Sequence, residues 1–267
     1  MNHDLKDFLA QLLNGQDLTE DQSEELMTAL AAGSVEPALA GALLVSLRMK
    51  GESAEEVRGF ANGMRKAAKE VVLENSSELI DIVGTGGDGS HSFNISTGAA
   101  LLSAACGLKV AKHGNRSVSS KSGSADLLEF LGYRFPMDAD GVKAQIKKNG
   151  FSFLFAPNFH PAMKHIAPIR QALKARTVFN ILGPLTNPAN PSFYLLGAFS
   201  SEMASLMASS LSGMDMNRAF VINGLNGWDE PTPASNFEIF DVREGSISHR
   251  IIDPSEYGIK KCKEEDL

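Results

Sequence analysis

Cysteine is scarce in this sequence, because Cys106 and Cys262 are the only two among 267 residues and lie far apart. Two distant thiols cannot build the disulfide framework of a small secreted domain or the paired spacing of a zinc site. No apolar run reaches the ~20 residues of a membrane-spanning helix, and the acidic, helical N-terminus does not have the pattern of a secretory signal. We therefore expect a cytoplasmic chain with two inert thiols.

Positive charge is also in short supply, since 25 basic residues face 32 acidic ones and the formal net charge is -7. Such a balance argues against nucleic acid or a membrane surface as a partner. It leaves open a local basic pocket for phosphates. With 43% hydrophobic residues, the chain can bury a sizeable core, either in one large domain or in a small domain beside a larger one.

The first third of the chain is predicted to form four short amphipathic helices. Apolar residues between Leu5 and Leu13 have helical spacing, and Gly15 ends that run. A Ser or Thr followed three residues later by Glu or Gln marks a helix start, and this pattern occurs at 19–22 and at 53–56. A further apolar helix is expected over about 38–49. Such helices need another surface to cover their apolar faces, either the rest of the chain or another subunit.

From residue 79 onward, predicted strands and helices alternate. This pattern is typical of an α/β domain with a mainly parallel central sheet. Strands are expected at 79–83, 108–111, 151–156, 218–223 and 237–242, and helices at 97–106, 124–131, 142–148 and 202–214. A polar connector near 66–78 suggests a helical domain over 1–70 and an α/β domain over 71–267. Prolines between 157 and 191 bend the chain, so that helices from about 161–180 pack back on the helical domain.

Four glycines in six residues, Gly84 to Gly89, follow the first expected strand. Glycine lets the backbone approach a ligand closely, and amides at the start of the next helix can face phosphate oxygens. The segment has neither the lysine of a P-loop nor the dinucleotide fingerprint. The alternative is a flexible turn with Ser96 or Thr97 as a helix cap. We favour phosphate binding, although Asp88 would repel phosphate and fits better beside a ribose hydroxyl or an amide.

Two more polar segments follow predicted strands. Lys112, Arg116 and Lys121 place positive charge in an acidic chain, which favours a polyanion such as pyrophosphate, at the strand end where open α/β sheets bind ligands. The alternative is a solvated surface loop. Asp229 and Glu230 follow another strand and suit a hard cation such as magnesium, the alternative being an ordinary acidic loop.

Taken in order, these loops resemble the signature loops of the anthranilate phosphoribosyltransferase family, and the resemblance extends over essentially the whole chain. It is carried by Gly84–Asp88, Asn94–Thr97, Lys112–Arg116, Ser119–Asp126, His160–His165, Arg170 and Phe179–Pro188. The resemblance implies a small helical domain, a larger α/β domain and a homodimer formed through the helical domain. It also implies the cofactor Mg²⁺, the substrates anthranilate and phosphoribosyl pyrophosphate, and a place in tryptophan biosynthesis.

The resemblance also implies roles for individual positions. The residues expected to contact phosphoribosyl pyrophosphate are Gly84, Gly87, Asp88, Ser92, Asn94, Ile95, Ser96, Thr97, Lys112, His113, Gly114, Asn115, Arg116, Ser117, Val118, Ser119, Ser120 and Ser124. Those expected to contact anthranilate are Gly84, Asn115 and Arg170, and those expected to ligate magnesium are Ser96, Asp229 and Glu230. Ser92 stands where the family commonly has threonine and keeps the hydroxyl. Family members usually continue beyond the position of Leu267, so we expect the α/β domain to be incomplete at its C-terminus.

The implied reaction breaks the bond between ribose C1 and the pyrophosphate oxygen, and the amine of anthranilate attacks C1 with inversion. Magnesium, Lys112 and loop amides would stabilise the negative charge that develops on pyrophosphate. An aromatic amine is neutral and nucleophilic at neutral pH, so we assign no catalytic base. Positioning would supply much of the acceleration, and the planar fork of Arg170 suits the anthranilate carboxylate. Two alternatives are a pyrimidine nucleoside phosphorylase-like enzyme and a non-catalytic nucleic-acid-binding relative of the same fold.

Overall fold

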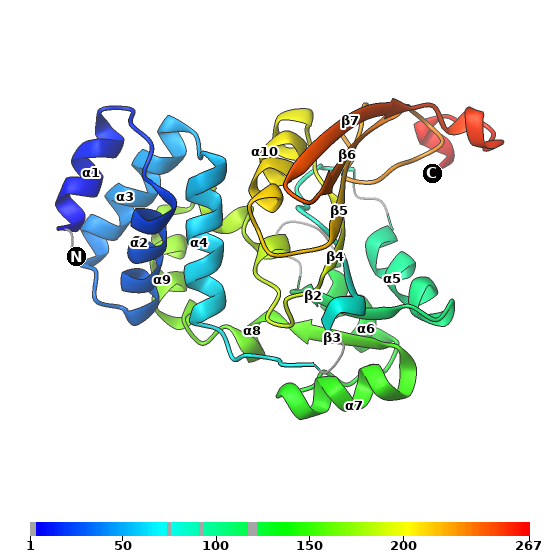
Figure 1. Cartoon of the computed structure of the whole chain (residues 1–267), viewed down its shortest axis with the longest axis horizontal. Helices are drawn as coiled ribbons and strands as arrows, with labels where there is room; N and C mark the ends of the chain where they lie inside the picture. The colour runs from blue at the N-terminus through cyan, green and yellow to red at the C-terminus, as the bar shows by residue number, and fades with distance from the viewer. Residues whose placement is uncertain (1–3, 74–75, 91–92, 117–121) are drawn as a thin grey trace.

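The computed structural model describes residues 4–73, 76–90, 93–116 and 122–267, and Figure 1 shows a helical bundle beside a twisted sheet with flanking helices. The bundle contains α1 (Leu5–Leu13), α2 (Glu20–Ala32), α3 (Pro37–Lys50) and α4 (Ala54–Lys66). Both predicted capping boxes are present, Thr19 with Gln22 and Ser53 with Glu56. Each box satisfies amide groups that a helix start would otherwise leave unpaired.

A helix from the middle of the chain completes the bundle. Helix α9 (Met163–Leu173) packs against α2 and α3, where Ile166 joins a core that also contains Leu26, Leu43 and Phe60. Figure 1 shows α9 lying among the blue N-terminal helices. Because the segment after α9 returns to the sheet, the two parts of the molecule are joined by packing as well as by the connector.

Direct contacts link the bundle to the sheet. Helix α4 packs on α10 (Ser201–Ser212). Arg65 of α4 donates from Nε to the carbonyl of Leu185 at 2.8 Å and from Nη2 to the hydroxyl of Tyr194 at 3.0 Å. Arg65 is half-buried in this junction, and its two hydrogen bonds tie α4 to the sheet.

The sheet has the strand order β3-β2-β1-β4-β5-β6-β7. Its strands are β1 (Leu79–Gly84), β2 (Lys109–Gly114), β3 (Phe151–Phe155), β4 (Phe193–Gly197), β5 (Arg218–Gly224), β6 (Phe237–Arg243) and β7 (Ser246–Ile252). Pairing is parallel from β3 to β5 and antiparallel from β5 to β7. The predicted fold class, a small helical part with a larger α/β part and a mainly parallel sheet, is confirmed.

Helices cover both faces of the sheet. Helix α10 packs on β5 and β6, and α5 (Ile95–Ala105) packs on β1 and β2. The other helices are α6 (Ser124–Phe130), α7 (Ala139–Asn149) and the single turn α8 (Ala156–Phe159). Successive residues of β1 serve the two faces, since Val83 joins the core beneath α10 while Ile82 joins the core beneath α5. None of the helices that the structure describes combines the length and the apolar character required to cross a bilayer.

One strand boundary was predicted wrongly. The sequence predicts that the second strand ends at Ala111 and that Lys112 and His113 begin a loop. In the structure β2 continues to Gly114 because its last residues pair with β3 as far as Phe155. Lys112 and His113 are therefore held by a sheet ladder, with 1% and 4% of their surfaces exposed, and not by a solvated loop.

Candidate active site

A cavity of about 670 Å³ lies between the helical bundle and the carboxyl ends of the parallel strands. The bundle contributes Arg48, Glu52 and Met64 to its wall. The opposite wall contains Gly86 and Glu230, which follow β1 and β5, and Lys112, which lies near the end of β2. The polar segments that the sequence analysis singled out thus share one cavity, as expected for loops at the carboxyl end of a parallel sheet.

Most of the predicted site residues that the structure describes line this cavity. They are Gly84, Gly87, Asp88, Asn94, Ser96, Lys112, His113, Gly114, Asn115, Arg116, Ser124, Arg170, Asp229 and Glu230. Ile95 and Thr97 lie outside the lining, Ile95 at the start of α5 and Thr97 fully buried in its first turn. The predicted contacts Ser92, Ser117, Val118, Ser119 and Ser120 lie outside the described residues.

Glycine is required where the loop that follows β5 approaches β1 and β4. The amide of Gly86 donates to Oδ2 of Asp229 at 2.9 Å. A Cβ atom at Gly84 would lie 2.5 Å from the same oxygen, and a Cβ atom at Gly197 would collide with the carbonyl of Asp229. Only glycine allows this approach, so the glycine loop serves here to hold a carboxylate in place.

Three carboxylates gather in the cavity. Asp88, Asp229 and Glu230 each offer an oxygen within 4.8 Å of the others. Oδ2 of Asp88 and Oε2 of Glu230 are buried and have no hydrogen-bond partner among the described atoms. Burial and the charge of Asp229 raise the pKa of Glu230, and burial and the charge of Asp88 raise the pKa of Asp229. Unpaired hard oxygen ligands are what magnesium prefers, so these residues fit that ion.

Asp88 is an addition to the predicted metal pair, because the sequence analysis placed it beside a ribose hydroxyl or an amide. The third predicted metal ligand, Ser96, lies beside Lys112, with 3.4 Å between its Oγ and the ammonium nitrogen. No sequence pattern joins Asp88 to residues 229 and 230. Their proximity comes from the order of the strands in the sheet.

Lys112 is a buried cation beside the carboxylates. Its ammonium group donates to the carbonyl of Ile82 and faces Ser96. Burial lowers the pKa of Lys112 to about 8, while the charges of Asp81, Glu230 and Asp229 oppose that change. A positive group beside a hard-cation site suits a diphosphate, whose charge both would share.

The two arginines predicted to contact substrates differ in availability. Arg170 is half-buried, its guanidinium lies 5.8 Å from the ring centre of Phe179, and no ion pair with a described carboxylate forms. Burial lowers the pKa of Arg170. Arg116 instead forms ion pairs of 3.1 Å with Asp126 and 2.7 Å with Glu129. Arg170 is thus free to receive a substrate carboxylate, whereas Arg116 must first exchange its partners.

Sequence reasoning missed two arginines of the cavity, Arg48, which forms an ion pair with Glu52, and Arg176. Arg176 has its Nη2 atom 3.4 Å from the carbonyl of Gly87, and its guanidinium lies 5.4 Å from the ring centre of Phe199. It forms no ion pair with a described acidic residue. Its position just before the family-like stretch at 179–188 was the available signal, but a single arginine in a polar turn does not stand out.

Two buried histidines complete this side of the cavity. His113 and His160 both line it, and their ring centres are 5.0 Å apart. Burial, with smaller contributions from neighbouring cations and from His160, lowers the pKa of His113 to about 3. Burial lowers the pKa of His160 to about 4. Both imidazoles are neutral near neutral pH and are weak bases.

Comparisons of the sequence and of the structure with known proteins point to one family. Residues 6–68 match the glycosyl transferase family helical bundle domain, and residues 76–267 match the glycosyl transferase family a/b domain. The anthranilate phosphoribosyltransferase of Thermoanaerobacter sp. (strain X514) is 45% identical over 264 residues, which are 98% of this chain and 78% of the relative. That of Nitrosomonas eutropha is 42% identical over 97% of this chain and 76% of the relative.

Solved structures of anthranilate phosphoribosyltransferases have a fold similar to that of this chain. The crystal structure of anthranilate phosphoribosyltransferase from Thermus thermophilus superposes with a TM-score of 0.86 at 42% identity, covering 98% of this chain and 77% of that one. The enzyme from Saccharomyces cerevisiae, solved in complex with PRPP and Mg, gives a TM-score of 0.84 at 27% identity, covering 98% and 76%. By sequence along nearly all of its length and by fold, the chain belongs to the anthranilate phosphoribosyltransferase family of glycosyl transferases.

Proposed function

We propose that the chain transfers the phosphoribosyl group of phosphoribosyl pyrophosphate to the amine of anthranilate, releasing pyrophosphate, as a step of tryptophan biosynthesis. Besides family membership, one observation carries this proposal. A single cavity holds a carboxylate cluster with a buried lysine and, separately, an arginine without an acidic partner among the described residues. The first group suits a magnesium-bound diphosphate, and the second suits an aromatic carboxylate.

The residues proposed to hold magnesium are Asp88, Asp229 and Glu230, together with Ser96. When bound, magnesium neutralises charge on the diphosphate. The ammonium group of Lys112 then lies on the same wall and stabilises the charge that appears as the bond to ribose C1 breaks. The glycine loop contributes its backbone shape, because Gly84 leaves room for Asp229 to approach.

Anthranilate is proposed to bind through Arg170, with Asn115 and Gly84 lining the same pocket. The ring of Phe179 beneath the guanidinium limits its motion, so the planar fork faces the cavity with little loss of freedom on binding. We assign no catalytic base. His113 and His160 are buried imidazoles in the cavity wall, and their low pKa values make them poor proton acceptors. Rate acceleration then comes from orientation of the amine towards C1 and from stabilisation of the leaving group.

The remaining predicted contacts with phosphoribosyl pyrophosphate stay part of the proposal. They are Gly87, Ser92, Asn94, Ile95, Thr97, His113, Gly114, Arg116, Ser117, Val118, Ser119, Ser120 and Ser124. For Arg116 the proposal includes a step in which the guanidinium leaves Asp126 and Glu129. The support for the set is its position, since the described members surround or adjoin the wall that carries Lys112.

We also propose a division into a helical domain over 1–70, with 161–180 packed on it, and an α/β domain over 71–267, and a homodimer formed through the helical domain. Two large apolar side chains of the bundle, Leu13 and Met49, are 70% and 83% exposed, and a partner subunit would cover such surface. The scarcity of cysteine supports a cytoplasmic location.

The decay of anthranilate fluorescence on mixing with phosphoribosyl pyrophosphate and magnesium tests the proposed reaction. We expect decay that depends on all three components and on the protein. A parallel assay for phosphate-dependent nucleoside cleavage tests the phosphorylase alternative, and salt-dependent DNA binding without anthranilate turnover would favour the non-catalytic one. Intact anthranilate fluorescence in the complete mixture would refute the proposal.

A further inference from the structure

The ladder between the two strands β1 and β2 stops early. These strands pair only at Leu79 and Ile80 of β1. Yet β1 stays paired with β4 as far as Gly84, and β2 stays paired with β3 as far as Gly114. The sheet is therefore split between β1 and β2 at the end that faces the cavity, while both strands remain regular on their other sides.

Two buried side chains form hydrogen bonds to backbone groups of β2 along this split. Oδ1 of Asp81 accepts from the amide of His113 at 3.3 Å, and Oδ2 accepts from Nδ2 of Asn187 at 2.8 Å. The same amide group of Asn187 donates to the carbonyl of Ala111 at 2.8 Å. Asp81 and Asn187 have no exposed surface. They satisfy backbone groups of β2 that an unbroken ladder would pair with β1, as buried polar groups require.

Lys112, a residue of β2, forms the corresponding hydrogen bond to the backbone of β1. Its ammonium group donates to the carbonyl of Ile82, so a β2 side chain satisfies the β1 backbone while the Asp81 side chain satisfies the β2 backbone. Asp81 is also the acidic residue whose charge acts most strongly on Lys112. The position of the lysine is thus set by an exchange of side-chain contacts between two parted strands.

We propose that Asp81 is a positioning residue for the reaction proposed above: it holds the end of β2 away from β1 and so directs Lys112 to the place where the diphosphate binds. Asp81 is not among the residues that line the cavity, so it acts through Lys112 and the end of β2. The inference rests on the proposed function for its ligand, but it concerns diphosphate binding and not the transfer step.

Positioning and simple charge effects predict opposite results for Asp81→Asn. Removing a negative charge near an anion site strengthens anion binding if charge alone matters. Asparagine, however, offers one oxygen to two donors, the amides of His113 and Asn187. One donor then faces an NH₂ group in either orientation of the side chain. One of the two hydrogen bonds across the split is therefore lost, and the end of β2 shifts. Positioning therefore predicts weaker binding.

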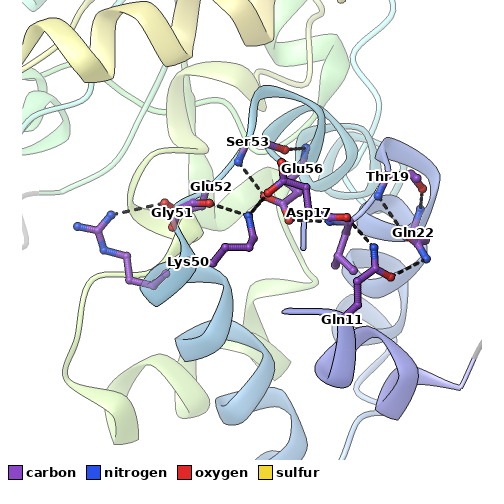
Figure 2. Close-up of polar contacts among 11 residues, drawn as sticks. Gln11, Asp17, Thr19, Gln22, Lys50, Gly51, Glu52, Ser53 and Glu56 are labelled. Carbon is purple, nitrogen blue, oxygen red and sulfur yellow. Dashed lines mark hydrogen bonds and ion pairs between the residues drawn. The ribbon is translucent and has the colours of Figure 1, made fainter. Parts of the chain in front are cut away.

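Glu56 supplies a matched control, shown in Figure 2. It is a fully buried carboxylate of α4 that accepts from the amides of Leu18 at 2.9 Å and Ser53 at 2.7 Å. It also pairs with the ammonium group of Lys50 at 2.8 Å. Glu56→Gln makes the same chemical change in a similar setting, within the helical bundle and outside the cavity lining.

The experiment is calorimetric titration of the full chain with inorganic pyrophosphate in the presence of magnesium. Circular dichroism and thermal melting first establish that each variant is folded at the titration temperature. We expect Asp81→Asn to weaken binding by about tenfold, the scale of one hydrogen bond to a charged group. Glu56→Gln should bind as the wild type does even if it melts earlier. In a Lys112→Met background, Asp81→Asn should have almost no further effect.

Three results would overturn the proposal: unchanged or tighter binding by folded Asp81→Asn, the same loss with and without Lys112, or no pyrophosphate binding by the wild type. If Asp81→Asn does not fold, Asn187→Ala removes the hydrogen bonds of Asn187 to Asp81 and Ala111 while keeping the carboxylate of Asp81. It should also weaken binding only when Lys112 is present, and unchanged binding would then overturn the proposal. Failure of the proposed function appears separately, as absent anthranilate turnover by a wild type that still binds pyrophosphate.

Discussion

The Nε2 atoms of His113 and His160 lie 3.0 Å apart, in a buried contact between two imidazoles beside the cavity. Nδ1 of His113 lies 3.0 Å from the carbonyl of Gly183, which can only accept, so the proton of His113 is on Nδ1. Its Nε2 atom therefore accepts the proton that His160 carries on Nε2. Burial lowers the pKa of both rings, so the pair stays neutral near neutral pH.

This pair predicts a loss of stability in mild acid. The pKa values of about 3 for His113 and about 4 for His160 lie below the value near 6.5 of an unfolded histidine. The unfolded chain therefore binds more protons between these values, and the free energy of unfolding decreases as the pH falls through that range. Each imidazole adds up to about 1.4 kcal/mol per pH unit.

Urea unfolding at a series of pH values between about 4.5 and 7 measures this slope. His160→Gln should make the slope shallower, because one of the two depressed imidazoles is gone. His165→Asn is the control, since this histidine is exposed and should leave the slope unchanged. An equally steep slope in His160→Gln would show that other groups cause the acid sensitivity.

For Arg170, the expected result is a selective loss of anthranilate use. Its guanidinium forms no ion pair with a described carboxylate and is half-buried, so the substrate carboxylate supplies its partner. Arg170→Ala should raise the KM for anthranilate by about 10- to 100-fold, the range for a charge-assisted hydrogen bond, and leave the KM for phosphoribosyl pyrophosphate nearly unchanged. Steady-state titration of each substrate measures both constants. An equal rise in both would contradict the assigned role.

Arg176 should show the reverse selectivity. It lies against Gly87 in the glycine loop, where the diphosphate substrate is proposed to bind. Because this side chain is exposed, its contribution is screened, and Arg176→Ala should raise the KM for phosphoribosyl pyrophosphate by only about fivefold. The loss should shrink with added salt, and Arg176→Lys should recover part of it. Arg170→Ala, assayed in parallel, is the reciprocal control, and a larger effect of Arg176→Ala on anthranilate would contradict the prediction.

The carboxylate cluster predicts how the chain responds to magnesium. Asp229→Asn combined with Glu230→Gln removes two of the three clustered carboxylates, so turnover in magnesium should fall by about 100-fold or more. Magnesium should raise the melting temperature of the wild type and not of this variant. Glu238→Gln is the control, a buried carboxylate bound by His249 and Ser201 outside the cavity lining. Retained magnesium activation in the double variant would remove the metal assignment.

Local signals in the sequence predicted the helix starts well. The boxes at Thr19 and Ser53 each contain both partners within four residues, so no tertiary contact is needed to recognise them. The cavity-lining loops were also predictable, because their glycines and charges follow apolar runs. Asp88 could be placed in the right loop but not beside Asp229, since their contact depends on strand order in the sheet.

Pairing between strands explains the parts of the sheet that the sequence did not predict. Strand β4 is five residues long and follows a proline- and asparagine-rich stretch, and its identity comes from pairing with β1 and β5 on either side. Nearly all of β7 is exposed, and it forms by pairing with β6. Lys112 and His113 have the composition of a loop, yet β3 holds them in a strand.

The position of β4 between β1 and β5 has a consequence for the order of assembly during refolding. Gly84 and Asp229 belong to or follow strands that do not touch, so they meet only after β4 has inserted between them. Contacts between segments so distant along the chain form slowly. We therefore expect helical circular dichroism to return before the fluorescence or calorimetric response to magnesium. The delay should be set by the rate at which β4 pairs with β1 and β5.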